Sequence, residues 1–94
     1  MKWKQLTQEV SGKVQDVVST IFTFEGKQNE ITNIDTSCGC VNNIFDYPFL
    51  KVDLKLPKKH PAIEESVFYV DKNIYITYID GTTNTLTIKA TIYE

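Results

Sequence analysis

The sequence predicts an all-β protein: an immunoglobulin-like antiparallel β-sandwich of about seven strands, in one domain spanning residues 1–94. Three observations lead to this prediction. Val, Ile and Thr make up 29 of the 94 residues, whereas Leu and Ala together make up seven, and branched Cβ atoms favour strands over helices. Apolar and polar residues alternate in several short runs. Turn-forming residues separate these runs at roughly the 8–12-residue spacing of a sandwich.

The N-terminal residues have the least regular pattern. Apolar residues between positions 6 and 17 have a helical spacing, yet residues 14–18 could equally begin a strand. Since the rest of the chain favours strands, we expect an edge strand or docking segment over residues 1–11. We place a turn at Ser11-Gly12.

The next segments predict two strands and a loop. Residues 18–24 place Val, Thr and Phe side chains on one face, and a Glu-Gly-Lys turn ends this run at residues 25–27. Residues 31–40 form a second extended stretch. Residues 41–49 combine an Asn-Asn pair with Asp-Tyr-Pro, which is typical of a loop because proline cannot donate to a sheet.

The clearest strand signal runs from Leu50 to Leu56, where every second residue is apolar and the others are charged. A proline-bounded loop follows at residues 57–61. Residues 74–78 and 86–92 then alternate in the same way. The segment between them, residues 80–84, is polar and contains a glycine, so the two runs predict an antiparallel hairpin.

Composition argues against some classes of partner. All ten basic residues are lysines and the formal net charge is −2. The chain therefore lacks both a positive field and the guanidinium fork that binds phosphates and guanine, so we expect no nucleic-acid partner. Its N-terminus has no apolar run of signal-peptide length, and nowhere do about 18 apolar residues follow one another. We expect no secretory signal and no membrane span, and a location in a virion or the host cytoplasm.

The Ser37-Cys38-Gly39-Cys40 segment is the most unusual motif. Its two thiols could hold half of a zinc site, form a redox pair, or be small structural residues. Tetrahedral zinc takes about four ligands, and the chain adds one histidine, His60. Residues i and i+2 of a strand lie roughly 6.6 Å apart at Cα, close to the upper limit of about 6.8 Å for a disulfide. We therefore expect reduced, structural cysteines, no metal and no cofactor.

This motif and the segments around it resemble a known family. The matching segments are residues 12–14, 22–24, 31–40, 72–76 and 86–92. They are similar to the bacterial domain of unknown function 1573, which is related to Hydin-type (ASH) immunoglobulin-like domains. The resemblance covers roughly residues 12–92 and implies an immunoglobulin-like fold with no known enzymatic activity. The family's Pro-Gly turn in mid-domain is replaced here by Pro57–Pro61 and an insertion through Glu65. Many relatives look secreted or lipid-anchored, and this chain shows neither signal.

Catalysis requires a nucleophile, a base and an orienting group that converge on a pocket. The only histidine, His60, lies in a loop rich in Lys and Pro, and the acidic residues are spread along the predicted strand faces. We expect this histidine to be a solvated loop residue. The sequence therefore predicts a protein that is not an enzyme.

Aromatic residues mark the predicted binding positions. Phe45, Tyr47 and Phe49 share the loop before the clearest strand, and Trp3 lies near the N-terminus. Interfaces favour such aromatic anchors, so all four are candidate contacts with a partner. Two alternatives remain open: Phe49 and Phe45 could fold back into the core, and Trp3 could cap one end of the sandwich.

Three hypotheses about function follow from the sequence. The first is an accessory (decoration) subunit of a viral particle such as a bacteriophage capsid, bound to the larger assembly or to further copies of itself. The second is a protein- or glycan-binding immunoglobulin-like module of a bacterial surface system. The third is a thiol or metal protein that uses Cys38 and Cys40, with His60 as a further ligand.

Overall fold

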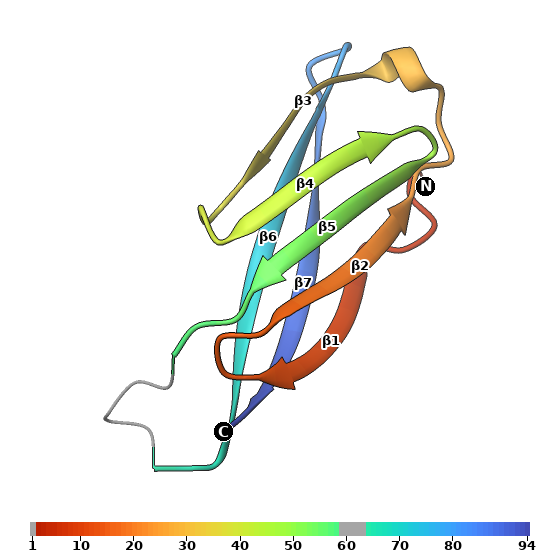
Figure 1. The fold of residues 1–94 in the computed structure, drawn as a ribbon. Helices are drawn as coiled ribbons and strands as arrows, with labels where there is room; N and C mark the ends of the chain where they lie inside the picture. The colour runs from red at the N-terminus through yellow and green to blue at the C-terminus, as the bar shows by residue number, and fades with distance from the viewer. Residues whose placement is uncertain (1, 59–63) are drawn as a thin grey trace.

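Seven strands form two sheets that pack face to face in the computed structural model, which describes residues 2–58 and 64–94 (Figure 1). The elements are β1 (Thr7–Lys13), β2 (Val17–Thr23), the 3₁₀ turn η1 (Gln28–Glu30), β3 (Ile31–Thr36), β4 (Val41–Asp46), β5 (Phe49–Lys55), β6 (Val67–Tyr78) and β7 (Thr83–Tyr93). One sheet has the strand order β1-β7-β6-β3 and the other β2-β5-β4. The predicted all-β sandwich of about seven strands is confirmed.

The strand order is immunoglobulin-like. Strands β2-β5-β4 and β7-β6-β3 pair in the order of strands B-E-D and G-F-C of an immunoglobulin domain. Strand β1 pairs with β7 in parallel, from Thr7 opposite Thr87 to Lys13 opposite Tyr93. The prediction of a wholly antiparallel sandwich is therefore wrong for this pair. A connection of only three residues carries the chain from β1 in one sheet to β2 in the other, so the direction of β2 determines that of β1.

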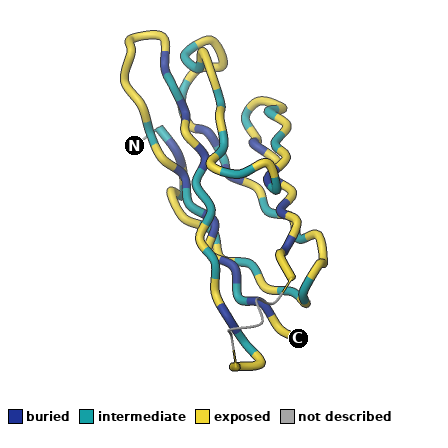
Figure 2. The backbone as a smooth tube through the Cα atoms, turned by 90° about the vertical axis from the view of Figure 1, so that its left-hand side faces the viewer, coloured by how far each residue is buried: buried dark blue, intermediate teal, exposed yellow. Residues whose placement is uncertain are grey.

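The core lies between the sheets and follows the predicted alternation. Along β5, β6 and β7 the residues that point into the core are even-numbered. The fully buried side chains among them are Leu50, Val52, Leu54, Ile74, Ile76, Leu86, Ile88 and Ile92. Buried and exposed residues alternate along these strands (Figure 2). The predicted hairpin of residues 74–78 and 86–92 is confirmed as β6 and β7, whose register runs from Val67 opposite Tyr93 to Thr77 opposite Thr83.

Strand β4 corrects the prediction of a loop over residues 41–49. It pairs with β5 from Val41 opposite Leu54 to Asp46 opposite Phe49, which leaves only Tyr47-Pro48, with a cis peptide bond, as the turn. Asn42 faces solvent and Asn43 is half-buried, and both are tolerated because β4 lies at the edge of its sheet. The extended stretch of residues 31–40 is also interrupted, since β3 ends at Thr36.

Gly12 lies inside β1, so the predicted turn at Ser11-Gly12 is wrong. The chain turns at residues 14–16 instead, where Gln15 has a φ of 67°. Gly12 serves packing: a Cβ there would lie 2.9 Å from Val18 Cγ1 and 3.0 Å from Leu56 Cδ1. The glycine allows β1 and β2 to approach each other across the end of the sandwich. The expected edge strand at the N-terminus is present and extends to Lys13.

Trp3 connects the N-terminal segment to both sheets. Its side chain is 1% exposed, and its Nε1 donates a hydrogen bond to Tyr78 Oη at 2.7 Å. Its ring lies 4.9 Å from that of Phe24, which follows β2, and the Lys4 amide donates to the Thr23 carbonyl at 2.9 Å. Tyr78 Oη in turn donates to Asn84 Oδ1. Trp3 therefore caps the sandwich, and its predicted role as a partner contact is wrong because no surface of its ring is left for a partner.

We predict that Tyr78→Phe lowers the free energy of unfolding by about 1–3 kcal/mol, because it leaves the buried Trp3 indole N–H without an acceptor. Urea denaturation followed by Trp fluorescence measures this change. Tyr75→Phe is the matched control, since Tyr75 is exposed on the same strand and its hydroxyl makes no hydrogen bond within the described residues. Equal stability of the two variants would contradict the assigned role of the Trp3–Tyr78 bond.

Lys2 covers this cap from outside. Its Nζ lies 2.7 Å from Glu30 Oε2 and 4.4 Å from the centre of the Tyr78 ring. The hydrogen bond from Lys2 holds the pKa of Glu30 below its ordinary value of 4.5, and the hydrogen bond to Glu30 raises the pKa of Lys2 above 10.5. Both side chains remain partly exposed to solvent, which screens the interaction, so the pair adds little to stability.

A carboxyl group whose pKa is lower in the folded than in the unfolded state stabilises the fold at pH values above its unfolded-state pKa. This stability is lost as the pH falls through the folded-state pKa. We predict that the difference in melting temperature between wild type and Glu30→Gln is largest above pH 4.5 and shrinks as the pH falls below it. Thermal unfolding over a pH series measures this. The same series in a Lys2→Met background should show a smaller pH dependence; an unchanged one would contradict the pairing.

Candidate binding surface

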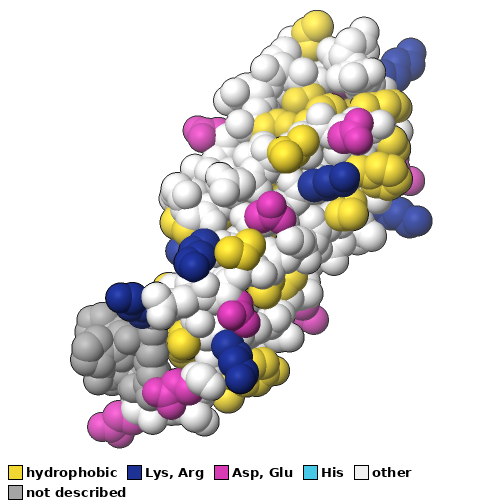
Figure 3. Space-filling model, viewed as in Figure 1, with side chains coloured by type: hydrophobic (Ala, Val, Ile, Leu, Met, Phe, Trp, Pro, Cys, Tyr) yellow, Lys and Arg dark blue, Asp and Glu magenta, His cyan; other side chains and the backbone are white. Residues whose placement is uncertain are grey.

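The outer face of the sheet β2-β5-β4 carries apolar side chains in an aligned group. Ile21 of β2 and Ile44 of β4 both lie opposite Lys51 of β5, and Phe49 lies one row further along β5. The exposed fractions are 46% for Ile21, 66% for Ile44 and 44% for Phe49. We call these three residues the apolar face. Figure 3 shows hydrophobic side chains gathered on the half of this sheet nearest the β4–β5 turn.

The apolar face is not explained by folding. Its side chains point away from the core. The alternate residues of β2 and β5, which face inward, already fill the core. A solvated sheet face ordinarily alternates core-facing apolar with outward polar residues. Single exposed apolar residues are normal, but neighbouring ones on adjacent strands mark interaction surfaces. The apolar face is therefore the strongest candidate for contact with a partner.

Polar groups lie beside it. Lys51 stands between the two isoleucines, and Asp46 lies opposite Phe49 at the edge of the sheet. Asp53, one row away, accepts a hydrogen bond from Ser19 Oγ at 2.6 Å. A lysine stem can cover apolar surface while its ammonium group stays in solvent, so Lys51 does not divide the apolar area.

The three aromatic residues predicted as loop contacts have different positions. Phe45 is partly buried and packs against the core, which bears out the alternative that it fills the core. Phe49 points outward and belongs to the apolar face, so the core alternative is wrong for it. Tyr47 borders the face: it is partly exposed, its hydroxyl donates to the Gly26 carbonyl at 2.8 Å, and its ring lies 6.2 Å from that of Phe45.

Sequence reasoning missed Ile21 and Ile44. The signal for Ile21 was present, because the predicted inward positions 18, 20, 22 and 24 leave residue 21 on the solvent side. An isoleucine there breaks the pattern of a solvated face. Ile44 carried no such signal, since its segment was interpreted as a loop. The two isoleucines are distant in sequence, and the register of β5 between them brings them to the same row.

Cys38 and Cys40 form a disulfide, so the prediction of reduced cysteines is wrong. That prediction assumed strand geometry, whereas the chain turns between β3 and β4 and the two Cα atoms are 5.2 Å apart. The turn is held by hydrogen bonds from Thr36 Oγ1 and the Val41 amide to the Cys38 carbonyl, at 3.1 and 3.2 Å. Ser37 fixes it to β6 by exchanging two hydrogen bonds with Asn73. The disulfide and these hydrogen bonds together hold the turn between β3 and β4.

The bonded thiols cannot act as metal ligands. Within residues 2–58 and 64–94 no three Cys, His, Asp or Glu side chains converge in a way that could hold an ion. His60, named as the third candidate ligand, lies outside the described residues, as does most of the predicted loop at 57–61. The described residues therefore offer no geometry in support of the metal part of the thiol or metal hypothesis.

We predict that replacing both cysteines with serine lowers the free energy of unfolding by only about 1–2 kcal/mol, because the bridge closes a loop of three residues and so restricts the unfolded chain little. Chemical denaturation of the double variant measures the loss. Wild-type protein with a reductant should show the same decrease. A loss of folding in either experiment would mean that the bridge organises more than its own turn.

Comparison with protein-family models, with curated proteins and with solved structures finds no match to this chain. The resemblance to domain 1573 stays a prediction. Along the described parts of the chain, no helix has the length and apolar character needed to cross a membrane. Any proposal about function therefore rests on the geometry of the molecular surface.

Proposed function

We propose that this chain is a non-enzymatic accessory subunit that attaches to a larger protein assembly through the apolar face. A viral particle such as a bacteriophage capsid is the assembly we favour. The observation that carries the proposal is the aligned exposure of Ile21, Ile44 and Phe49 on one sheet face. Removing such side chains from water on contact with a partner is favourable in proportion to the apolar area buried.

The chemistry of the face favours a protein as the partner. Two of its three residues, Ile21 and Ile44, are aliphatic: unlike Phe49 they offer no aromatic ring to a sugar, and they match an apolar protein surface. Lys51 between them selects a partner with an acceptor at the centre of the contact, such as a carboxylate or a strand-end carbonyl. Asp46 and Tyr47 supply polar groups at the rim, which is where interfaces place them.

The small footprint favours repeated attachment. Three apolar residues and their rim cover much less than the roughly 800 Å² per partner of a standard stable interface. A single contact of this size is weak. Copies bound at repeated positions of a lattice, and held close to one another, would gain durability from multivalency. A particle with many equivalent positions therefore suits this surface better than a solitary partner does.

We predict that Ile44→Ser reduces attachment by about tenfold, the effect of truncating an anchor residue of an interface. Ile79→Ser is the matched control, because Ile79 is equally accessible but follows β6 in the other sheet. Particles purified from the source that encodes the chain are sedimented with each protein, and bound and free fractions are measured. Both residues are exposed, so both variants should fold like wild type.

The control makes the outcomes distinct. If Ile79→Ser loses binding as Ile44→Ser does, the apolar face is not the contact. If wild-type protein fails to sediment with the particles and instead forms a dimer that Ile44→Ser dissociates, the face is a self-association surface and the proposal of an accessory subunit is wrong.

A further inference from the structure

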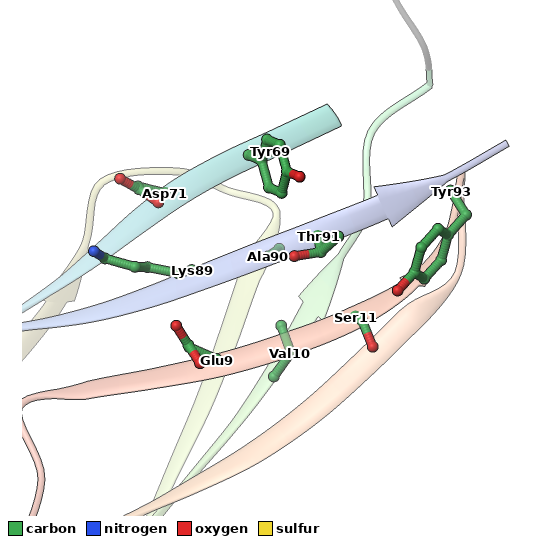
Figure 4. A pocket seen from close by; sticks show the side chains of 9 residues that line it. All are labelled: Glu9, Val10, Ser11, Tyr69, Asp71, Lys89, Ala90, Thr91 and Tyr93. Carbon is green, nitrogen blue, oxygen red and sulfur yellow. The ribbon is translucent and has the colours of Figure 1, made fainter. Parts of the chain in front are cut away.

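A groove of about 640 Å³ lies on the opposite side of the molecule from the apolar face, on the outer surface of strands β1, β7 and β6. Figure 4 shows the nine residues that line it. The groove is open to solvent along the sheet. It involves none of the residues of the apolar face, so its properties do not depend on the function proposed for that face.

The walls of the groove carry two tyrosines. Tyr69 of β6 is 74% exposed and Tyr93 near the end of β7 is 43% exposed. Thr91 lies between them on the sheet, opposite Tyr69, with Ser11 of β1 on its other side (Figure 4). Successive outward rows of a sheet are about 6.7 Å apart, so a ring-sized ligand fits between one tyrosine and the next row.

A row of three charges crosses the groove beside the tyrosines. Lys89 of β7 lies opposite Glu9 of β1 on one side and Asp71 of β6 on the other (Figure 4). Within the described residues, none of these three side chains makes a hydrogen bond or an ion pair with another side chain. Their donors and acceptors are therefore available to a ligand, and strand pairing holds the backbone of all three residues in one row.

We infer that this groove binds a neutral saccharide. A pyranose ring has an apolar C–H face and a rim of hydroxyl groups. Tyr69 offers an aromatic face for the first, at a low cost in conformational entropy because tyrosine has few rotatable bonds. Asp71 and Glu9 accept hydrogen bonds from hydroxyl groups, and Lys89 donates to them; such charge-assisted bonds are stronger than neutral ones.

Other ligand classes fit the groove less well. Two carboxylates beside one ammonium group give the row a net negative charge, which opposes phosphates, nucleic acid and acidic sugars. An apolar peptide would leave the three charges desolvated and unpaired. A neutral polyhydroxylated ligand satisfies the charges and uses the tyrosines in the same pose, which is the combination of apolar walls and a few placed polar groups that ligand sites show.

The test uses three neutral hexasaccharides: α-1,4-linked glucose, β-1,4-linked glucose and β-1,4-linked N-acetylglucosamine. Each is titrated into ¹⁵N-labelled protein up to about 10 mM, the range of a weak single site. We expect at least one to shift amide resonances of Tyr69, Asp71, Lys89 and Thr91 while those of Ile21 and Ile44 stay unchanged. A heparin-derived hexasaccharide, which is anionic, should shift none of them.

Variants then assign the contacts. Tyr69→Ala should weaken saccharide binding by about tenfold, as loss of a hot-spot aromatic does, and Asp71→Asn should weaken it less. Tyr75→Ala is the matched control, because Tyr75 lies exposed on the same strand and face but outside the groove, opposite Thr85. Its affinity should equal that of wild type.

Four results overturn the proposal: no shift with any neutral hexasaccharide, stronger binding of the anionic one, an equal effect of Tyr69→Ala and Tyr75→Ala, or shifts confined to the apolar face. If the particles used to test the apolar face protect the groove amides from hydrogen exchange, and no saccharide binds, the groove is instead a second protein contact. The function proposed for the apolar face is tested separately, by Ile44→Ser.

Discussion

The hydrogen bond from Trp3 to Tyr78 is the contact on which the arrangement of the N-terminal strand depends. It joins a residue ahead of β1 to the end of β6, 75 positions later in the chain, while the same indole ring packs on Phe24 beyond β2. The N-terminal segment is thereby held across the end of both sheets. From that position the chain enters the four-stranded sheet beside β7 and runs parallel to it.

The position of β1 beside β7 determines which side chains lie on the outer faces of the two sheets. With β1 placed beside β7, Glu9 and Ser11 come level with Lys89 and Thr91 and complete one side of the groove. The three-stranded sheet lacks β1 and keeps β2 as an edge strand, where Gln8 Nε2 donates a hydrogen bond to the Ile21 carbonyl at 2.8 Å. That bond occupies an edge acceptor of β2 and limits pairing with another chain.

The strands that alternate most strictly could be predicted from the sequence. Residues 50–55 of β5 and 86–92 of β7 reveal their inward face because polar and apolar residues alternate there without a break, and the glycine-containing polar turn reveals the hairpin. Strand β4 could not be recognised, since its two Asn residues and the Pro that follows it are typical of loops, and only the edge position of β4 makes the Asn residues acceptable in a strand. The burial of Trp3 depends on a contact with distant Tyr78, to which no local pattern refers.

The candidate surfaces likewise include residues that a local pattern could reveal and residues that only strand pairing brings together. Phe49 could be proposed from its local context, whereas Ile44 required knowledge of the register with β5. The charged row of the groove was beyond prediction, because Glu9, Asp71 and Lys89 come from three separate strands and meet only through pairing. The disulfide was missed for a different reason: the strand spacing assumed for Cys38 and Cys40 does not apply in a turn.

The position of the two surfaces on opposite sheets has a consequence for how they could work together. Packed sheets lie about 10 Å apart, and the close-packed core between them holds their orientation. If the apolar face is covered by an assembly, the groove faces away from that assembly and remains open. Attachment would then orient every bound copy with Tyr69 and Tyr93 toward solvent. An array of copies would present many weak saccharide sites in the same direction, and multivalency would give such an array an affinity that a single groove lacks.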